Sequence, residues 1–237
     1  MILYYVRHGD PIYNPDSLTP LGQRQAEAVG KRLALYGIDE VYSSDSNRAM
    51  QTAEPTCQLL KKEKKLCHWA NENVAWREFT VANVEGRMTW GFHHKPTVEL
   101  FNSSEVRALG DKWYEHPAFE GTGFKDGMLR VNGEADAFLL SLGYRHNREG
   151  GFYEAVEPNE KRIALFAHQG FGMAFLSSVM DMNYPHFSTH FDISHSSVTV
   201  IRFAGEGRIY PKLLQLSNDS HLYKEGLLTG YNNSIRI

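Results

Sequence analysis

Short apolar runs alternate with amphipathic stretches along this chain, a pattern that predicts strands followed by helices. Residues 2–6 (ILYYV) have the aromatic and β-branched content of a buried strand. Similar runs predict further strands over 38–42, 162–167, 198–203 and 209–216, the last two joined as a hairpin around 205–207. Strands that alternate with helices build a mostly parallel sheet. We therefore expect a three-layer α/β fold with helices on both faces of the sheet.

The expected helices are marked by residues that favour helix ends. Thr19 followed by Pro20 is a typical helix start and Gly37 a typical end, so a helix is expected between them. The turn at 43–46 (SSDS) supplies capping residues for a second helix, whose apolar positions are Met50, Ala53, Cys57 and Leu60. The spacing of apolar residues predicts two later helices, over 134–145 and 171–179.

Residues 76–130 interrupt this alternation. They are rich in glycine, histidine, tryptophan and phenylalanine, with some helix expected over 97–113. We interpret them as a cap-like insertion over the active edge, within a single domain that spans 1–237. Most of their Trp and Phe side chains are expected to form the core of the insertion. His93 and His94 either line the mouth of the pocket or lie exposed in a loop.

Composition narrows the class of protein. Hydrophobic residues make up 42% of 237 residues, enough for a sizeable core, and the net charge of −3 without a basic stretch disfavours nucleic-acid binding. No apolar run approaches the ~20 residues that cross a membrane. Cys57 and Cys67 are too few for a disulfide framework or a thiolate metal site. The first strand begins at the first residue, so we expect no targeting peptide and a cytoplasmic protein; the oligomeric state is not indicated.

Ionisable side chains follow three of the predicted strands. Arg7 and His8 come directly after the first strand, Arg48 lies in the first turn of the helix after the second, and His168 stands between a later strand and its helix. The carboxyl ends of neighbouring parallel strands meet at one edge of the sheet, where ligands bind. Guanidinium groups and a helix N-terminus both favour phosphate oxygens. The sequence therefore predicts a phosphoryl-binding site at this edge.

Five segments in order resemble the histidine phosphatase superfamily, also called the phosphoglycerate mutase-like family. The first is the RHG motif, Arg7-His8-Gly9, and Asn14 falls where many members have an asparagine. The other four are the stretches 18–26, 43–53, 76–86 and 166–170. They contain Leu18-Thr19-x-x-Gly22-x-x-Gln25-Ala26, Ser43-Ser44-x-x-x-Arg48-Ala49-x-Gln51-Thr52-Ala53, Trp76-x-Glu78 with Glu85-Gly86, and Phe166-Ala167-His168-Gln169-Gly170.

The resemblance implies a hydrolase that needs no metal and no cofactor and that releases inorganic phosphate from a small phosphorylated metabolite. His8, as a neutral imidazole, would attack phosphorus and form a phosphohistidine intermediate. Arg7, Arg48 and His168 would hold the phosphoryl oxygens and stabilise the charge of the transition state.

The resemblance also implies the remaining roles. Asn14 and the backbone amide of Gln169 would add hydrogen bonds to the phosphoryl group. Glu78 would protonate the leaving alcohol and then activate the water that cleaves the intermediate, with Glu85 as the alternative acid.

Two other functions stay open. A phosphoglycerate mutase uses the same core, but family mutases carry a segment like Asn-Glu-Arg-His-Tyr-Gly at the acid and an Arg-Arg pair in the insertion. Residues 76–86 lack the first and no Arg-Arg pair occurs in the chain, so we favour a phosphatase. The third candidate is a catalytically silent module that binds a phosphorylated ligand.

Overall fold

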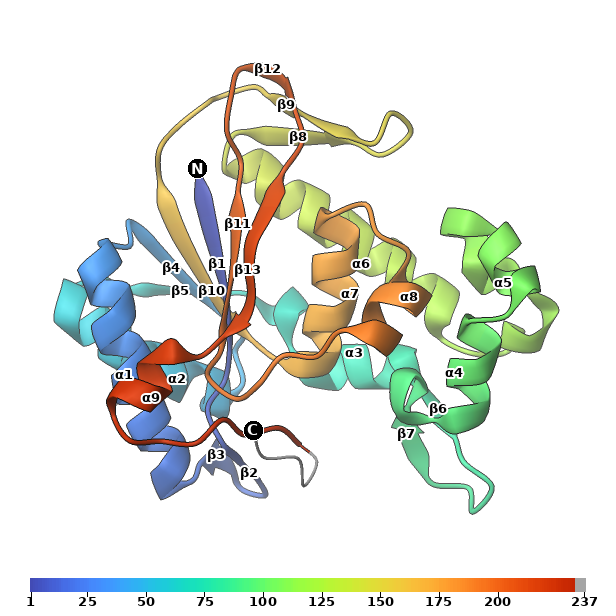
Figure 1. Cartoon of the computed structure of the whole chain (residues 1–237), viewed down its shortest axis with the longest axis horizontal. Coiled ribbons are helices and arrows are strands. Elements are labelled where there is room, and N and C mark those ends of the chain that lie inside the picture. Colours follow the sequence, from blue (N-terminus) through green and yellow to red (C-terminus); the bar gives the residue numbers. More distant parts are fainter. Residues whose placement is uncertain (233–237) are drawn as a thin grey trace.

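A six-stranded sheet lies at the centre of the computed structural model, which describes residues 1–232 (Figure 1). The strand order is β13-β11-β1-β10-β4-β5, with β1, β10, β4 and β5 parallel and β11 antiparallel to both β1 and β13. The mostly parallel α/β sheet expected from the sequence is thereby confirmed. The strands span Ile2–Arg7 (β1), Glu40–Ser43 (β4), Lys64–Leu66 (β5), Arg162–Ala167 (β10), Val198–Arg202 (β11) and Lys212–Asn218 (β13).

Helices cover both faces because successive residues of a strand point to opposite sides. Tyr4 and Val6 of β1 pack with the apolar residues of α1 and α2, whereas Leu3 and Tyr5 pack with those of α6 and α7. Figure 1 shows α1, α2 and α9 on one side of the sheet and α3, α6, α7 and α8 on the other. The helices span Pro20–Tyr36 (α1), Asn47–Leu60 (α2), Glu72–Phe79 (α3), Phe124–Ser141 (α6), Gln169–Val179 (α7), Tyr184–His190 (α8) and Ser220–Lys224 (α9).

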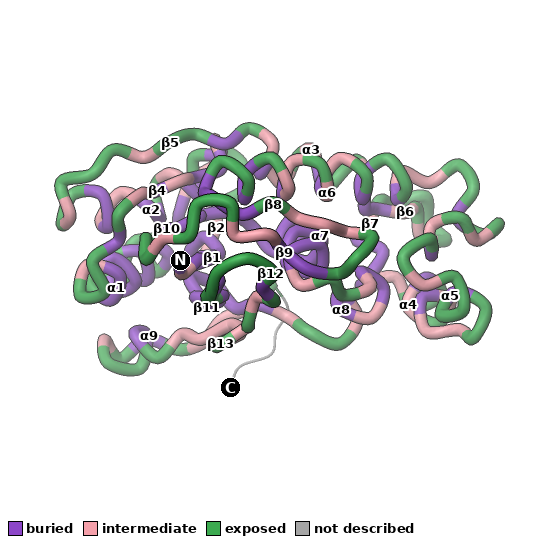
Figure 2. Tube along the Cα trace, turned by 90° about the horizontal axis from the view of Figure 1, so that it is seen from above, coloured by how far each residue is buried: buried purple, intermediate pink, exposed green. Residues whose placement is uncertain are grey.

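Local sequence signals place the ends of the first helix as expected. The Thr19 hydroxyl accepts the N–H of Gly22 at 3.0 Å, and Gly37 adopts a left-handed conformation with φ of 72°. The later helix α7 is buried at every residue, which fits its apolar content and its central place in Figure 2. No helix within residues 1–232 is long and apolar enough to cross a membrane.

The helix expected over 134–145 has different bounds in the structure. It begins ten residues earlier, at Phe124, because Phe124, Met128 and Val131 fill the core despite two glycines in that stretch. It ends at Ser141, because Gly143 turns the chain with φ of 99° and a Cβ there would lie 2.4 Å from the carbonyl oxygen of Glu157. Residues 144–147 then form a strand.

The two strands expected on either side of 205–207 pair antiparallel, as β11 with β13, but a short strand of another sheet lies between them. A second sheet of three strands has the order β12-β9-β8, with β8 at Tyr144–Asn147, β9 at Phe152–Ala155 and β12 at Gly207–Ile209. The stretch predicted as one strand over 209–216 is therefore divided. Its beginning pairs with β9 as β12, and its remainder pairs with β11 as β13.

Short elements between α3 and α6 occupy the region that interrupts the sequence pattern. They are β6 (Thr80–Ala82), β7 (Met88–Trp90) and α4 (Lys95–Phe101), followed by α5 (Ser104–Ala108) and short 3₁₀ turns. Figure 1 shows them beside α8, to one side of the sheet. Trp113, Phe119 and Phe124 pack against one another with ring centroids 5.4–5.5 Å apart, as expected for the core of this region.

Candidate active site

The ends of three neighbouring strands bring the expected charged residues together. Arg7 is the last residue of β1, and the N–H of His8 donates to the carbonyl oxygen of Ala167 at the end of β10. His168 follows, so the rings of His8 and His168 have centroids 5.2 Å apart. The next strand, β4, leads through a serine-rich turn to Arg48 in the first turn of α2. The four residues therefore meet at the edge predicted from the sequence.

His8 is buried as a neutral imidazole with a defined tautomer. Its Nδ1 lies 2.7 Å from the carbonyl oxygen of Gly9, which can only accept, so Nδ1 carries the proton. Burial, together with the neighbouring imidazole of His168 and the charges of Arg7 and Arg48, lowers the pKa of His8 well below its usual value. The Nε2 lone pair is thus free at neutral pH, as a nucleophile requires.

The glycine of the RHG motif has a packing role. A Cβ on Gly9 would lie 2.6 Å from the carbonyl oxygen of Gly22, in the first turn of α1. The N–H of Gly9 donates to Thr52 Oγ1 of α2 at 3.0 Å. The loop that carries His8 is therefore held between two helices, and only glycine fits there.

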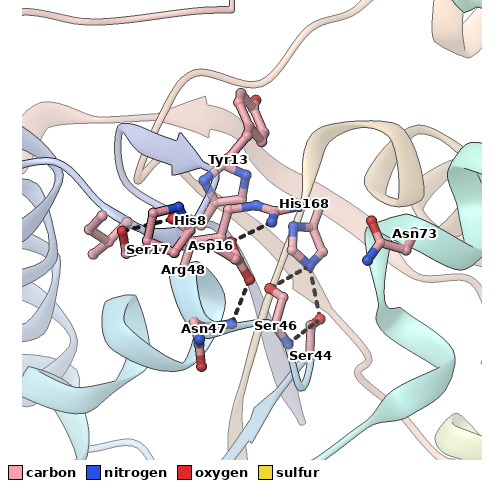
Figure 3. A network of polar contacts seen from close by, with 12 residues as sticks. His8, Tyr13, Asp16, Ser17, Ser44, Ser46, Asn47, Arg48, Asn73 and His168 are labelled. Atoms are coloured by element: carbon pink, nitrogen blue, oxygen red, sulfur yellow. Dashed lines mark hydrogen bonds and ion pairs between the residues drawn. The ribbon is translucent and has the colours of Figure 1, made fainter.

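Within the described residues, both arginines keep a buried N–H without a protein partner. Arg7 donates through Nη1 to the carbonyl oxygen of Ile193 and through Nη2 to Asn232 Oδ1, at 2.5 and 2.6 Å. Arg48 donates through Nη1 to Asp16 Oδ1 at 2.6 Å (Figure 3). The Nε atoms of Arg7 and Arg48 are buried and have no partner among residues 1–232. Two charged donors are therefore available to an oxyanion.

Two hydroxyl groups orient His168. Its Nε2 lies 2.8 Å from Ser44 Oγ and 3.2 Å from Ser46 Oγ, both in the turn after β4 (Figure 3). The hydroxyl of Tyr5 donates to the carbonyl oxygen of His168 at 2.6 Å. Burial, Arg48 and Arg7 lower the pKa of His168 well below its usual value. The ring is therefore neutral and fixed against the turn.

The two expected accessory residues have different positions. Gln169 is buried at the start of α7, where its amide donates to Asp192 Oδ1 at 2.5 Å and its carbonyl accepts from Asn232 at 3.1 Å. Asn14 is exposed in the turn between β2 (Pro11–Tyr13) and β3 (Asp16–Leu18) and does not line the pocket. The hairpin turns Tyr13 and Asp16 toward Arg48 instead, so Asn14 is corrected to a surface position.

The expected acid, Glu78, does not face the pocket. Both of its carboxylate oxygens accept from Arg130, at 2.6 Å each, and it is absent from the pocket wall. The alternative, Glu85, is exposed in the turn between β6 and β7. These expectations are corrected because the carboxylate of Glu78 is held on the side of α3 that meets α6.

A different glutamate, Glu72, lines the pocket. It is the first residue of α3, and its oxygens accept the N–H groups of Gly170 and Phe171 at 2.9 Å each, at the start of α7. Burial raises the pKa of Glu72, against the opposing effects of the two N–H groups and of the site arginines. The sequence signal for Glu72 was its place at a helix start shortly after the short strand β5, six residues beyond Leu66, and the charged run 61–65 concealed that strand.

Sequence reasoning also missed Asn232 and His195. Asn232 Oδ1 accepts from Arg7 and lies 2.8 Å from Nε2 of His195, and the N–H of His195 donates to the carbonyl oxygen of Gly230 at 2.7 Å. Burial and the charge of Arg7 lower the pKa of His195 to about 3. A contact between residues at positions 7 and 232 leaves no local signal in a single sequence.

Asn232 is expected to position Arg7 for anion binding. In Asn232→Ala, Arg7 loses one of its two acceptors, and a hydrogen bond to a charged group contributes about 1.5–3 kcal/mol. We expect the inhibition constant of inorganic phosphate to rise roughly tenfold or more. Asn83→Ala, in the turn between β6 and β7, serves as the control and should leave it unchanged. Unaltered phosphate inhibition in Asn232→Ala would show that Arg7 does not depend on this contact.

Arg48, Glu72, His195 and Asn232 line one open pocket of about 1160 Å³, whereas Arg7, His8 and His168 are buried beside them and are not part of its wall. Its walls come from the loop after β1, from α2 and α3, from the turn around β7 and from the segment that contains Asn232. Within residues 1–232, no group of three or more His, Cys, Asp or Glu side chains is arranged to hold a metal ion.

Residues 3–116 match the model of the histidine phosphatase superfamily (branch 1). Two curated relatives are named probable phosphoglycerate mutase GpmB. The one from Proteus mirabilis is 28% identical over 131 residues, which cover 44% of this chain and 60% of the relative. The one from Erwinia tasmaniensis is 30% identical over 116 residues, covering 38% and 54%. The chain thus spans somewhat more than half the length of these relatives.

Solved structures resemble the chain over most of its length. A mycobacterial glucosyl-3-phosphoglycerate phosphatase with inorganic phosphate has a TM-score of 0.60 at 17% identity, covering 93% of this chain and 98% of its own. Entamoeba histolytica phosphoserine phosphatase with 3-phosphoglyceric acid gives 0.58 at 20%, with the same coverage. A putative alpha-ribazole-5'-P phosphatase from Escherichia coli gives 0.57 at 18%, covering 92% and 98%. At these identities the likeness establishes the fold.

Proposed function

Because the chain belongs to the histidine phosphatase superfamily, we propose that it hydrolyses a small phosphomonoester through a phosphohistidine intermediate on His8. The observation that carries this proposal is the state of His8, a buried neutral imidazole whose Nδ1 proton is donated to the Gly9 carbonyl. That hydrogen bond leaves Nε2 unprotonated, in a cluster with two arginines whose Nε–H donors have no partner among residues 1–232. A nucleophile beside fixed positive charge is what phosphoryl transfer requires.

The first step forms the intermediate. His8 Nε2 attacks phosphorus as the bond from phosphorus to the ester oxygen breaks, and Glu72 gives its proton to the departing alcohol. The Nε–H groups of Arg7 and Arg48 donate to the phosphoryl oxygens as charge develops on them. The raised pKa of Glu72 keeps its proton available for this transfer.

The second step releases phosphate. The carboxylate of Glu72 removes a proton from water, the oxygen of that water bonds to phosphorus, and the bond between nitrogen and phosphorus breaks. His8 returns to its neutral form and Glu72 to its protonated form. Among the expected catalytic residues, this proposal keeps Arg7, His8, Arg48 and His168 and replaces Glu78 by Glu72.

Residues 76–130 are proposed to act as a cap over the pocket, within a single domain. Trp76, Trp90, Phe92 and His93 all line the pocket and all fall within 76–130. They face the entrance to the phosphate site from α3 and from the turn around β7. Substrate choice is therefore assigned to this region, and His93, unlike His94, contributes to the pocket wall.

Mutase activity is the second candidate, because both curated relatives carry that name. A mutase must hold the carboxylate of phosphoglycerate. Arg48 is the one arginine or lysine among the pocket-lining residues that the structure describes, and it is paired with Asp16. This charge distribution supports hydrolysis.

Turnover in the presence of a chelator tests the proposal. We expect phosphate release from p-nitrophenyl phosphate and from some metabolite phosphates. Isomerisation of 3-phosphoglycerate that depends on 2,3-bisphosphoglycerate, without net phosphate release, would make the protein a mutase. No turnover with any compound would favour a binding module.

The pH dependence of kcat should report the two ionisations. His8 must be neutral, so activity falls only when the pH drops through its lowered pKa. Glu72 must be protonated in the first step, so activity with alkyl phosphates falls as the pH rises through its raised pKa. For alkyl phosphates at saturating concentration, we expect kcat to follow a bell-shaped pH profile. For p-nitrophenyl phosphate, most of the fall in kcat at alkaline pH should be absent. An alkaline limb of the same size for both esters would contradict the assignment of Glu72.

A further inference from the structure

One side of the pocket is a wall of three aromatic rings, Trp76, Trp90 and Phe92. Trp76 meets Trp90 edge to face with centroids 4.9 Å apart, and Trp90 stacks on Phe92 at 5.5 Å with 16° between the ring planes. The sequence had favoured a core role for Trp90 and Phe92. Both are 8% exposed and belong to the core, but the surface they keep faces the pocket.

This aromatic wall is fixed in place next to the proposed acid. Trp90 packs so closely on the start of α7 that a Cβ on Gly170 would lie 2.3 Å from its ring. The N–H of the same Gly170 donates to Glu72. Glu72 and Trp76 also stand four residues apart on α3, a spacing that places both on one side of the helix. The alcohol that Glu72 protonates is therefore released beside the aromatic rings.

The charged residues that line the pocket disfavour a second anionic group on the substrate. Asp10 and Asp16 line the pocket, whereas Arg48 is its single cationic residue within the described part of the chain and is already paired with Asp16. Burial lowers the pKa of His93 and of His195, so both imidazoles are neutral at neutral pH. A carboxylate or a second phosphate on the substrate would be desolvated near Asp10 without a counter-charge.

The size of the pocket leaves room for a ring system. Its volume of about 1160 Å³ is somewhat larger than the roughly 300–1,000 Å³ that is typical of small-molecule sites. Aromatic side chains bind planar rings by stacking and edge contacts, and they also attract cations through their faces. A short ester that carries a carboxylate has neither a ring to stack nor a positive charge, so it would gain nothing from these aromatic side chains.

We infer that the substrate is a phosphomonoester whose alcohol carries an aromatic ring, uncharged or positively charged, and no second anionic group. This inference rests on the proposed phosphatase function. It assigns Trp76, Trp90 and Phe92 to recognition of the alcohol and leaves the phosphoryl group to the residues at the strand ends.

Matched esters test the inference on the unmodified protein. Benzyl and ethyl phosphate have leaving alcohols of similar acidity but differ in the ring, and 4-carboxybenzyl phosphate adds only an anion. We expect kcat/KM for benzyl phosphate to exceed that for ethyl phosphate roughly tenfold or more, since ring burial and aromatic contact together contribute about 1.5–3 kcal/mol. The carboxyl group should remove most of this advantage.

Variants of the aromatic wall test whether it causes the preference for benzyl phosphate. Trp76→Ala should lower kcat/KM for benzyl phosphate several-fold with little change for ethyl phosphate, and Trp76→Phe should restore most of it. Tyr223→Ala is the control, because that exposed aromatic lies on α9 and does not line the pocket. An equal loss on both esters in Trp76→Ala would indicate general damage and contradict a role in recognition.

The outcomes separate the inference from the proposed function. Hydrolysis of both esters with equal kcat/KM overturns the aromatic preference and leaves the phosphatase proposal standing. If neither ester is hydrolysed, the phosphatase proposal fails, and binding of benzylphosphonate and ethylphosphonate, measured by calorimetry, decides the inference. Tighter binding of benzylphosphonate supports the aromatic wall as a recognition surface, and equal affinity overturns it.

Discussion

Replacing His8 by alanine is expected to abolish phosphate release, with kcat lowered roughly 10⁴-fold or more because the nucleophile itself is lost. The protein should remain folded, since the change removes a ring without introducing a buried charge. Rapid alkaline quenching of the wild-type protein with ³²P-labelled substrate should trap label on histidine, because a phosphohistidine is stable in base and labile in acid. His8→Ala should show no such label.

A control variant at another histidine, and mapping of the labelled residue, make this test specific for His8. His190 is exposed on α8 and does not line the pocket, so His190→Ala should retain both turnover and labelling. Two other buried imidazoles lie near His8, with ring centroids 5.2 Å away for His168 and 6.0 Å for His195. Label that persists in His8→Ala and maps to either of them would reassign the nucleophile.

Changing Glu72 to glutamine should produce the second-largest loss, and the loss should depend on the leaving group. An amide cannot donate the proton that an alkyl alcohol needs, so kcat for ethyl or benzyl phosphate is expected to fall about 10²–10³-fold. p-Nitrophenolate leaves without protonation, so formation of the intermediate from p-nitrophenyl phosphate should change little. Single-turnover measurement of p-nitrophenolate release isolates that step.

Glu78→Gln provides the contrast, because it alters the carboxylate that the sequence favoured as the acid. That change weakens the paired hydrogen bonds to Arg130, which join α3 to α6. We expect kcat to stay within about threefold of wild type and the loss of stability to be about 1 kcal/mol, since the pair is partly exposed. A leaving-group dependence in Glu78→Gln, with none in Glu72→Gln, would restore Glu78 as the acid.

The sequence predicted the parts of the fold that depend on local signals. β1 and β10 are buried on both faces and so appear as unbroken apolar runs, and the caps Thr19 and Gly37 delimit α1. Because Arg7, His8 and His168 directly follow those runs, their meeting at the sheet edge could be inferred without the structure. Arg48 followed from the capping signals at the start of α2.

The missed features depend on contacts that the local pattern does not encode. β5 is a short edge strand with the sequence KKL, which looks like a solvated charge run, so the turn after it and Glu72 were overlooked. Asn232 reaches Arg7 across 225 positions of the chain. The first half of α6 contains glycines and is helical because of the aromatic core it joins.

The arrangement of the pocket has a consequence for how such a protein diversifies. The groups proposed to hold the phosphoryl moiety come from three separated places in the chain, around Arg7 and His8, at Arg48 and at His168, and each is tied to a strand end or a helix start. The aromatic wall comes from a single stretch, 76–92, which lies outside the central sheet. Exchanging that one stretch between homologous genes would change which alcohol is accepted while the chemistry stays intact. The choice of substrate alcohol and the phosphoryl-transfer chemistry can thus change independently, in evolution or by engineering.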